Sequence, residues 1–192
     1  MRALEKMSLE ELWQLFPIVL KEHNPNYELW YEEERAQIAR ELDSRHIYRI
    51  SHIGSTAVKG LIAKPIIDIL LELVPGCNKD AAIRILREDG WLVMAENEEE
   101  GTVDLNKGYT LQGFAEKVFH LHIKPPGDWG ELYFRDYLKM QPEIAREYER
   151  LKLELKEEFE YNRDAYTEAK TEFVRHHTCL AKEAFPNRYI PK

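Results

Sequence analysis

The residues best suited to chemistry lie within residues 51–73, in the stretch SHIGSTAVKGLIAKPIIDILLEL. Gly54, Ser55 and Thr56 stand near its beginning, and Asp68 lies inside the apolar run near its end. Free amides and hydroxyls where a strand gives way to a helical turn suit a phosphate, and a carboxylate in an apolar strand suits a metal ion. The stretch therefore raises three alternatives: a phosphate-binding loop, a metal–carboxylate site, or a turn that leads into a buried strand.

The order of the residues excludes a P-loop. A Walker A motif needs a glycine, four residues and then Gly-Lys followed by Ser or Thr, so that backbone amides and the lysine enclose a phosphate. Here Lys59 precedes Gly60, and Leu61 stands where the hydroxyl residue is required. Because a Gly-Ser pair after a strand is usually only a turn, Gly54 and Ser55 need further evidence before they indicate phosphate binding.

Asp68 is the more informative residue. On a strand over residues 64–74, Asp68 shares one face with Leu70 and Glu72, and the opposite face is apolar throughout. A strand that is apolar on both faces is typically covered on both sides, where a carboxylate is costly unless it is hydrogen-bonded, paired or bound to a metal. Either Asp68 caps a neighbouring loop or pairs with Lys64, or it is held rigidly toward a cleft.

A second strand, VFHLHIK, repeats this pattern around residue 120. Its alternation places His120, His122 and Lys124 on one face. Histidines at positions i and i+2 can ligate one metal ion or contact one anion, although an isolated pair is more often partly exposed on a polar face. Only adjacency to Asp68 would make these histidines part of a site.

Basic residues in the C-terminal third could supply counter-charges to a phosphate. Arg135, Lys139, Lys152 and Lys170 all fall on predicted helices, where a solvated surface position is the default. Tyr166 and Lys170 are four residues apart and would share a helical face. These cations become binding residues only if the helices bring them to the strands.

Hydrophobic periodicity predicts the elements that must position these residues. A short N-terminal helix should follow the capping-box spacing of Ser8 and Glu11. We expect further helices over about 27–43, 78–90 and 164–184, and strands over 47–53, 64–74, 91–95, 102–111 and 116–124, with Pro142 in the first turn of another helix. This pattern predicts an α/β (α+β) class, as one domain over residues 1–192 with a helical C-terminal segment over about 129–185.

Composition limits the classes of function. The 192 residues are 44% apolar and 32% charged, which is typical of a globular protein. The formal charge of −8 argues against an extended nucleic-acid surface, so an anionic ligand would need a local basic site. No apolar run is long enough to cross a bilayer, the N-terminus lacks the apolar segment of a signal peptide, and two cysteines are too few for a disulfide framework. We expect a soluble, cytoplasmic protein.

These residues make the chain resemble the GrpB family, a branch of the nucleotidyltransferase superfamily. The resemblance extends over about residues 27–174 and rests on four segments in order: HIGSTAVKGLIAKPIIDI, HLHI, FRDYLKMQPEIAREYERLK and RDAYTEAKTEF. The superfamily pattern is a Gly-Ser or Gly-Gly pair, a spacer, an Asp-x-Asp or Asp-x-Glu on a strand, and a third carboxylate on a later strand. Gly54-Ser55 and Asp68 match it.

The resemblance implies a nucleotidyltransferase-like mixed sheet that binds a nucleotide or another phosphorylated small molecule and transfers a nucleotidyl group from a nucleoside triphosphate. It implies that Asp68 binds a divalent metal, Mg²⁺ or Mn²⁺. The residues that would contact the phosphates are Gly54, Ser55, Thr56, Lys64, Arg135, Lys152 and Lys170.

The chain departs from the superfamily pattern at the remaining carboxylates. Leu70 stands at the second acidic position, Glu72 lies about 7 Å further along the strand, and His120 and His122 replace the third acid. We expect Asp68 and His122 to be metal ligands, and both histidines to act as ligands or as acid–base groups. Such a set of side chains would favour Zn²⁺ or Mn²⁺, or no metal, over Mg²⁺. Three hypotheses follow: a nucleotidyltransferase, a non-catalytic nucleotide- or CoA-binding module, which Leu70 favours, and a His/Asp transition-metal hydrolase.

Overall fold

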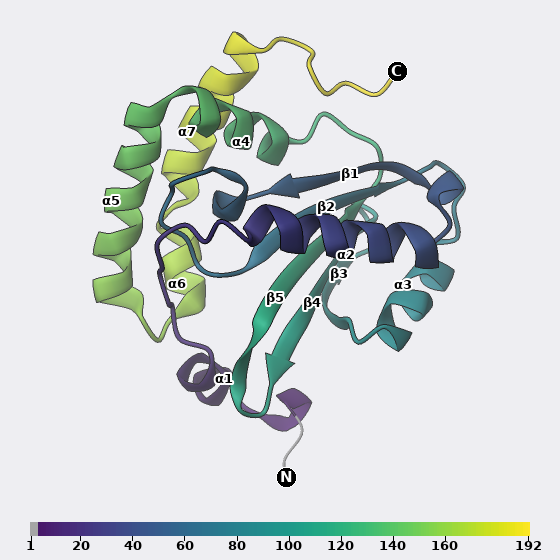
Figure 1. The fold of residues 1–192 in the computed structure, drawn as a ribbon, viewed down its shortest axis with the longest axis horizontal. Coiled ribbons are helices and arrows are strands. Elements are labelled where there is room, and N and C mark those ends of the chain that lie inside the picture. The colour runs from purple at the N-terminus through teal and green to yellow at the C-terminus, as the bar shows by residue number, and fades with distance from the viewer. Residues whose placement is uncertain (1–3) are drawn as a thin grey trace.

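The computed structural model describes residues 4–192 and has an α+β architecture built on one five-stranded mixed sheet (Figure 1). The strands are β1 (Ile47–Ile53), β2 (Ile67–Leu73), β3 (Leu92–Asn97), β4 (Thr102–Thr110) and β5 (Gly113–Lys124). Their order across the sheet is β1-β2-β5-β4-β3. Only β2 and β5 are parallel among these neighbours, and the other pairs are antiparallel. The predicted fold class is confirmed; residues 1–3 of the expected domain lie outside the described residues.

Helices cover both faces of the sheet. The helices of the described residues are α1 (Leu9–Leu15), α2 (Tyr27–Glu41), α3 (Lys79–Glu88), α4 (Gly130–Met140), α5 (Pro142–Phe159), α6 (Arg163–Glu168) and α7 (Thr171–Ala184), with short 3₁₀ turns at Leu4–Lys6, Ser44–His46 and Ser55–Ala57. In Figure 1, α1 lies beside the end of the β4–β5 hairpin, and the other helices flank the sheet. The predicted capping box is present at α1, where Ser8 accepts a hydrogen bond from the Glu11 amide and the Glu11 carboxylate accepts one from the Ser8 amide.

One face of the sheet packs against α2 and α3. Ile67, Ile69 and Leu71 of β2 are fully or almost fully buried in a cluster with Ile38 of α2 and Leu86 of α3. These β2 residues alternate with Asp68 and Leu70, whose side chains point to the opposite face. The apolar residues of β2 therefore hold the strand in place and leave Asp68 facing the C-terminal helices.

The other face is covered by α4–α7, which lie together beside β1 and β2 in Figure 1. Leu70 is fully buried against Ile53 of β1 and Leu132 of α4. A separate apolar cluster joins the turn after β1 to α4 and α5 through Leu61, Phe134 and other residues. The expected helical C-terminal segment thus forms the layer that closes over the polar side of the sheet.

Several predicted boundaries differ from the structure by a few residues, β5 for example beginning at Gly113 instead of residue 116, and two of the differences have a local cause. The strand expected over 64–74 begins only at Ile67, because Pro65 has no amide hydrogen to donate to a neighbouring strand. The helix expected over 164–184 is divided into α6 and α7 by a turn at 169–170. Thr167 and Thr171 flank this turn, and β-branched residues have low helix propensity.

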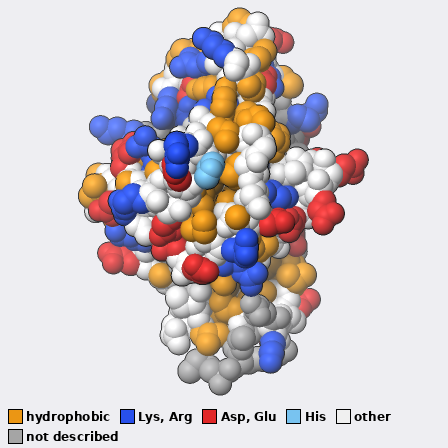
Figure 2. Space-filling view, turned by 90° about the vertical axis from the view of Figure 1, so that its right-hand side faces the viewer, with side chains coloured by type: hydrophobic (Ala, Val, Ile, Leu, Met, Phe, Trp, Pro, Cys, Tyr) orange, Lys and Arg blue, Asp and Glu red, His pale blue; other side chains and the backbone are white. Residues whose placement is uncertain are grey.

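The described part of the chain contains no helix that is both long and apolar enough to cross a membrane. Figure 2 shows acidic and basic side chains interspersed around a central band of hydrophobic ones, without a continuous basic surface among the described side chains of that face. This distribution agrees with the net charge of −8, so the basic groups that matter for an anion must be sought in a confined site.

Candidate functional site

A cavity of about 550 Å³ lies between the polar face of the sheet and helices α4–α7. Nearly all of the residues predicted from the sequence to form a site line this cavity: Gly54, Ser55, Thr56, Lys64, Asp68, His120, His122, Lys152 and Lys170. Phe134, Tyr148 and Tyr166 add aromatic walls. The structure therefore brings together residues from the β1–β2 connection, two strands and two helical regions.

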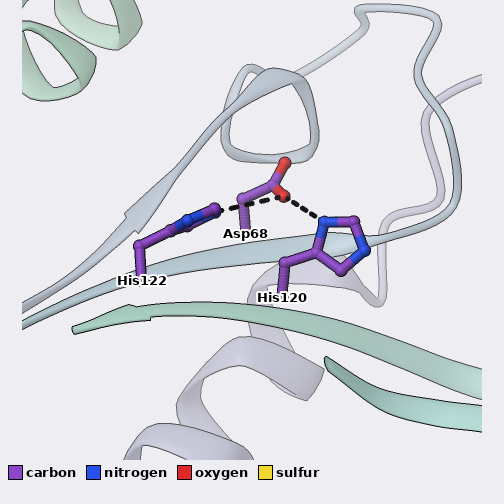
Figure 3. A group of neighbouring side chains, drawn as sticks. All are labelled: Asp68, His120 and His122. Carbon is purple, nitrogen blue, oxygen red and sulfur yellow. Dashed lines mark ion pairs between the residues drawn. The ribbon is translucent and has the colours of Figure 1, made fainter. Parts of the chain in front are cut away.

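The centre of the cavity is a cluster of Asp68, His120 and His122, whose side chains point toward one another (Figure 3). Parallel pairing of β2 with β5 places Asp68 beside His120 and Leu70 beside His122. Asp68 Oδ1 lies 3.2 Å from His120 Nδ1 and 3.9 Å from His122 Nε2. The adjacency on which the role of the histidines depended is present.

Asp68, His120 and His122 could together hold one divalent metal ion after small side-chain movements. Two donor atoms that are each about 2.1 Å from a single ion lie at most about 4.2 Å apart, and both distances from Asp68 Oδ1 satisfy this limit. All three donor atoms lie within 4.8 Å of one another, so small side-chain movements would bring them onto one ion. Two imidazoles and one carboxylate suit Zn²⁺ or Mn²⁺ better than Mg²⁺, which prefers oxygen ligands.

Asp104 of β4 orients His122 from its far side. His122 Nδ1 donates a hydrogen bond to Asp104 Oδ1 at 2.7 Å, so Nε2 points toward Asp68. A carboxylate behind a histidine ligand is a common arrangement in metal sites because it fixes the ring and its tautomer. Although burial alone would lower it, the pKa of His122 is raised to about 9 by Asp104 and Asp68.

Tyr109 and Arg163 hold His120 in place. His120 Nε2 lies 2.8 Å from the Tyr109 hydroxyl and 3.3 Å from an Arg163 guanidinium nitrogen. Burial lowers the pKa of His120 despite the neighbouring Asp68. Burial would raise the pKa of Asp68, but hydrogen bonds and charge from His120 and His122 hold it well below its usual range. The cluster therefore presents an ionised carboxylate to two imidazoles of different basicity.

Four cations surround this cluster. Lys64, Lys152, Arg163 and Lys170 all line the cavity, and Lys64 and Lys170 lie 5.7 Å and 4.2 Å from the centroid of the Tyr166 ring. Burial and the mutual repulsion of these groups lower the pKa of Lys64 to about 7 and that of Lys170 to about 8. Among the described residues, neither lysine has an ion-pair partner, so the cavity has an excess of positive charge.

Lys152 is bound at the edge of the cavity by two polar contacts. Its side chain is 2% exposed, and Nζ donates to the Ile62 carbonyl and lies 3.2 Å from Ser55 Oγ. Burial and repulsion by Lys170 lower the pKa of Lys152 to about 7. Ser55 is therefore directly connected to a buried amine.

Three residues considered from the sequence are occupied elsewhere. Arg135 donates to the His52 carbonyl and the Tyr189 hydroxyl and is absent from the cavity lining. Thr56 reaches the cavity wall, but its hydroxyl donates to the Ile66 carbonyl. Glu72 is fully buried and paired with Arg49, so it does not replace the missing second carboxylate. Arg135 was expected near the phosphates, but helix periodicity does not show its tertiary partners; Glu72 was expected to be too far along the strand to replace the second acid.

Sequence reasoning did not identify Asp104, Tyr109 or Arg163. Asp104 is the one acidic residue within the predicted strand TVDLNKGYTL, and its register opposite His122 could have been proposed from a hairpin between the two strands. Arg163 follows Asn162, whose side chain accepts from the Ala165 amide and caps α6. Nothing in the local sequence indicates that Arg163 reaches back to β5.

Comparisons with known proteins agree with this architecture. The model of the GrpB protein family matches residues 17–179. The glutamate-rich protein GrpB of Alkalihalophilus pseudofirmus is 32% identical over 162 residues, covering 82% of this chain and 91% of that protein. A UPF0157 protein of Pseudomonas aeruginosa is 38% identical over 126 residues, covering 65% of this chain, and the chain spans only 52% of its length.

A solved structure gives the same result for the fold. The crystal structure of the conserved protein GrpB from Enterococcus faecalis superimposes with a TM-score of 0.76 at 28% identity, covering 87% of this chain and 99% of that one. Because the family model covers most of the chain, including Gly54–Thr56, the Asp68–His120–His122 cluster and all four cavity cations, the chain belongs to the GrpB family.

Proposed function

We propose that the cavity binds a nucleotide, or another phosphorylated small molecule, together with one divalent metal ion, and that it transfers a nucleotidyl group from a nucleoside triphosphate. The observation that carries this proposal is the convergence of Asp68, His120 and His122 with the four cations in one cavity of about 550 Å³. A metal-ligand cluster and an anion site that share a wall suit a metal-bound polyphosphate.

The charge balance of the cavity favours an anionic ligand. Buried lysines with lowered pKa values hold their charge at a cost in free energy, and the cost falls when an anion neutralises them. Lys64 and Lys170 flank the Tyr166 ring, and Arg163 stands behind His120. Phosphate oxygens placed between these cations would receive charge-assisted hydrogen bonds.

The chain's own residues would share the work of the reaction. The cations Lys64, Lys170 and Arg163 would bind the phosphates and stabilise the negative charge that develops on them. Asp68, His120 and His122 would hold the metal ion, which supplies Lewis-acid polarisation of the phosphoryl oxygens when bound. The aromatic walls formed by Phe134, Tyr148 and Tyr166 would exclude water and offer faces for a base.

A binding experiment tests this proposal. Binding of ATP to the purified chain is measured by equilibrium dialysis with and without Mn²⁺, for the parent and for Asp68→Ala. We expect metal-dependent binding that Asp68→Ala abolishes with the fold intact by circular dichroism. Asp80→Ala, an exposed aspartate of α3 away from the cavity, serves as the matched control. Equal metal-dependent affinity in parent and Asp68→Ala would exclude the site.

The two imidazoles favour a second candidate function, the hydrolysis of a phosphate ester at a transition-metal centre. One carboxylate with His120 and His122 leaves room for a single nitrogen-rich metal site, whereas transfer by two metals needs more carboxylates. Elemental analysis of the protein as purified and product analysis distinguish the candidates. Bound zinc or manganese with release of inorganic phosphate supports hydrolysis, and release of pyrophosphate supports transfer.

A further inference from the structure

Ser55 has a polar environment that phosphate binding alone does not require. Its hydroxyl lies at the cavity wall, 3.2 Å from Lys152 Nζ. Tyr148 adjoins the same pair: Lys152 Nζ lies 4.8 Å from the Tyr148 ring centroid, and the Ser55 hydroxyl opposes the rise that burial causes in the pKa of the Tyr148 phenol. A serine, a buried lysine and a tyrosine thus meet within one corner of the cavity.

Helix α5 holds the lysine in a fixed position. Glu149 accepts a hydrogen bond from the Ile62 amide at 3.0 Å, and Lys152, one turn later, donates to the Ile62 carbonyl. The loop at Ile62 is therefore attached to α5 at both its amide and its carbonyl. Lys152 Nζ also donates to Ser55 Oγ at 3.2 Å, and an unprotonated amine held in this position could instead accept the serine proton.

The chemistry of this pair is that of an activated nucleophile. A serine hydroxyl is a weak nucleophile until an adjacent base accepts its proton, and lysine is the base in Ser-Lys catalytic pairs on other folds. Burial and the positive charge of Lys170 bring the pKa of Lys152 near neutrality, against the opposing effect of Glu149. Such an amine is partly unprotonated at pH 7, the condition a general base needs.

We propose that Ser55 is itself a nucleophile, with Lys152 as its general base, and that it accepts the nucleotidyl group of a nucleoside triphosphate bound in the cavity. This inference rests on the proposed function, because it requires the triphosphate to bind there. The close approach of Gly54 to Asp68 places Ser55, the next residue, in the wall of the same cavity as the candidate metal cluster.

The step balances without a further reactant. Ser55 Oγ attacks the α-phosphorus of the nucleoside triphosphate, and its proton passes to the neutral amine of Lys152. The bond between the α-phosphorus and the bridging oxygen to the β-phosphate breaks, and pyrophosphate leaves with the electron pair. The products are a phosphodiester between Ser55 and the nucleoside, protonated Lys152, and pyrophosphate.

Mass spectrometry of the intact chain tests the proposal. The parent is incubated with ATP and Mn²⁺, and the expected result is one added adenosine monophosphate, located on Ser55 by peptide sequencing, with an equal amount of pyrophosphate. Locating the added adenosine monophosphate in the parent chain requires no variant, so this result does not depend on whether a variant folds. Ser55→Ala should carry no label at this position, whereas Ser51→Ala, on β1 and outside the cavity lining, should label as the parent does.

Lys152→Arg separates a base from a mere counter-charge. Arginine keeps the positive charge but does not accept a proton near neutral pH, so labelling should fall by about 100-fold or more, while ATP binding changes only a few-fold. Lys59→Arg, at an exposed lysine outside the cavity, is the matched control. Lys152→Met is a second variant for the case in which the larger arginine disturbs the fold. Because it has neither the charge nor the base, it should also lose labelling.

The outcomes are distinguishable. ATP binding without any label on Ser55, a label on another residue, or transfer of the γ-phosphate alone with release of ADP each overturns the nucleophile and leaves the proposed binding function standing. Labelling of Lys152→Arg at the parent rate overturns the role of Lys152. Absence of ATP binding to the parent overturns both the proposed function and this inference.

Discussion

A side chain at position 54 would collide with Asp68. A Cβ added to Gly54 would lie 3.0 Å from Cγ and 3.1 Å from Cβ of Asp68, and closer still to its Oδ2. Gly54 also has a φ of 68°, in the left-handed region that favours glycine. The Gly-Ser pair is therefore more than a turn, because its glycine lets the backbone after β1 close onto the carboxylate of β2.

Gly54→Ala should lower stability and also remove metal binding. With a φ of 68° and a ψ of −172°, the backbone at Gly54 is in a region that essentially only glycine adopts, so strain should cost about 1–3 kcal/mol, and crowding against Asp68 should add about 1–3 kcal/mol. Gly60→Ala is the matched control, since Gly60 has a φ of 82° but a Cβ added there would meet nothing within 4 Å. Urea unfolding and Mn²⁺ titration should show backbone strain alone in Gly60→Ala. Equal Mn²⁺ affinity in the two variants would contradict the importance of this close approach.

Lys64→Met should stabilise the ligand-free protein at neutral pH. The folded pKa of about 7 lies below the unfolded value of about 10.4, so the unfolded chain binds more protons between these pH values. Stability of the parent should therefore rise with pH across this window. The advantage of Lys64→Met in free energy of unfolding should be largest below about pH 7 and shrink toward about pH 10.

The same substitution should weaken binding of pyrophosphate, the simplest polyanionic probe, because one of the cavity cations is lost. Lys59→Met, at an exposed lysine, is the control and should change neither property. Urea unfolding across pH and calorimetric titration with pyrophosphate measure the two effects. A stability gain for Lys64→Met that does not depend on pH would show that lost charge is not its cause.

Arg49 of β1 and Glu72 of β2 form an ion pair on the face of the sheet that also carries Asp68, yet their role is structural. Glu72 is fully buried, accepts hydrogen bonds from Arg49, including one of 2.8 Å, and accepts the Gly127 amide at 2.9 Å. Arg49→Met should destabilise by about 3–5 kcal/mol because a buried carboxylate loses its cation. The double variant Arg49→Met with Glu72→Met should recover much of this loss in urea unfolding. A double variant as unstable as the single one would contradict this explanation.

The sequence predicted the central half of the site because that half depends on strand periodicity. Asp68, His120 and His122 alternate with apolar residues, and alternation assigns each of them to the polar face of its own strand; the pairing of β2 with β5, which makes them neighbours, is seen only in the structure. The family resemblance supplied the link between the strands and Gly54-Ser55. The two faces of β2 and the helical C-terminal segment followed from the same apolar pattern.

The remaining half depends on tertiary packing that local patterns do not contain. Lys152 and Arg135 lie on helices with similar amphipathic patterns, but only Lys152 reaches the cavity, while Arg135 is held by Tyr189 near the C-terminus. Arg163 contacts His120 only because the break between α5 and α6 turns the chain back toward β5. Such long-range contacts depend on how the helices pack, and the helix propensities of single residues contain little information about packing.

Asp104→Asn should change how metal binding depends on pH. In the metal-free protein His122 holds a proton with a pKa of about 9, and a metal ion must displace this proton from Nε2. The affinity of the parent for Mn²⁺ should therefore rise with pH up to about 9. A neutral amide in place of the carboxylate would lower the pKa of His122, so the affinity of the variant should level off at a lower pH.

Above the pH at which the affinity of the variant levels off, the parent should bind Mn²⁺ about 10–100-fold more tightly, because the Asp104 carboxylate orients the ring and raises its basicity. Calorimetric titrations between about pH 6 and 9 test this, with Asp80→Asn as control, and identical pH profiles for parent and Asp104→Asn would contradict the role of Asp104 in metal binding through His122.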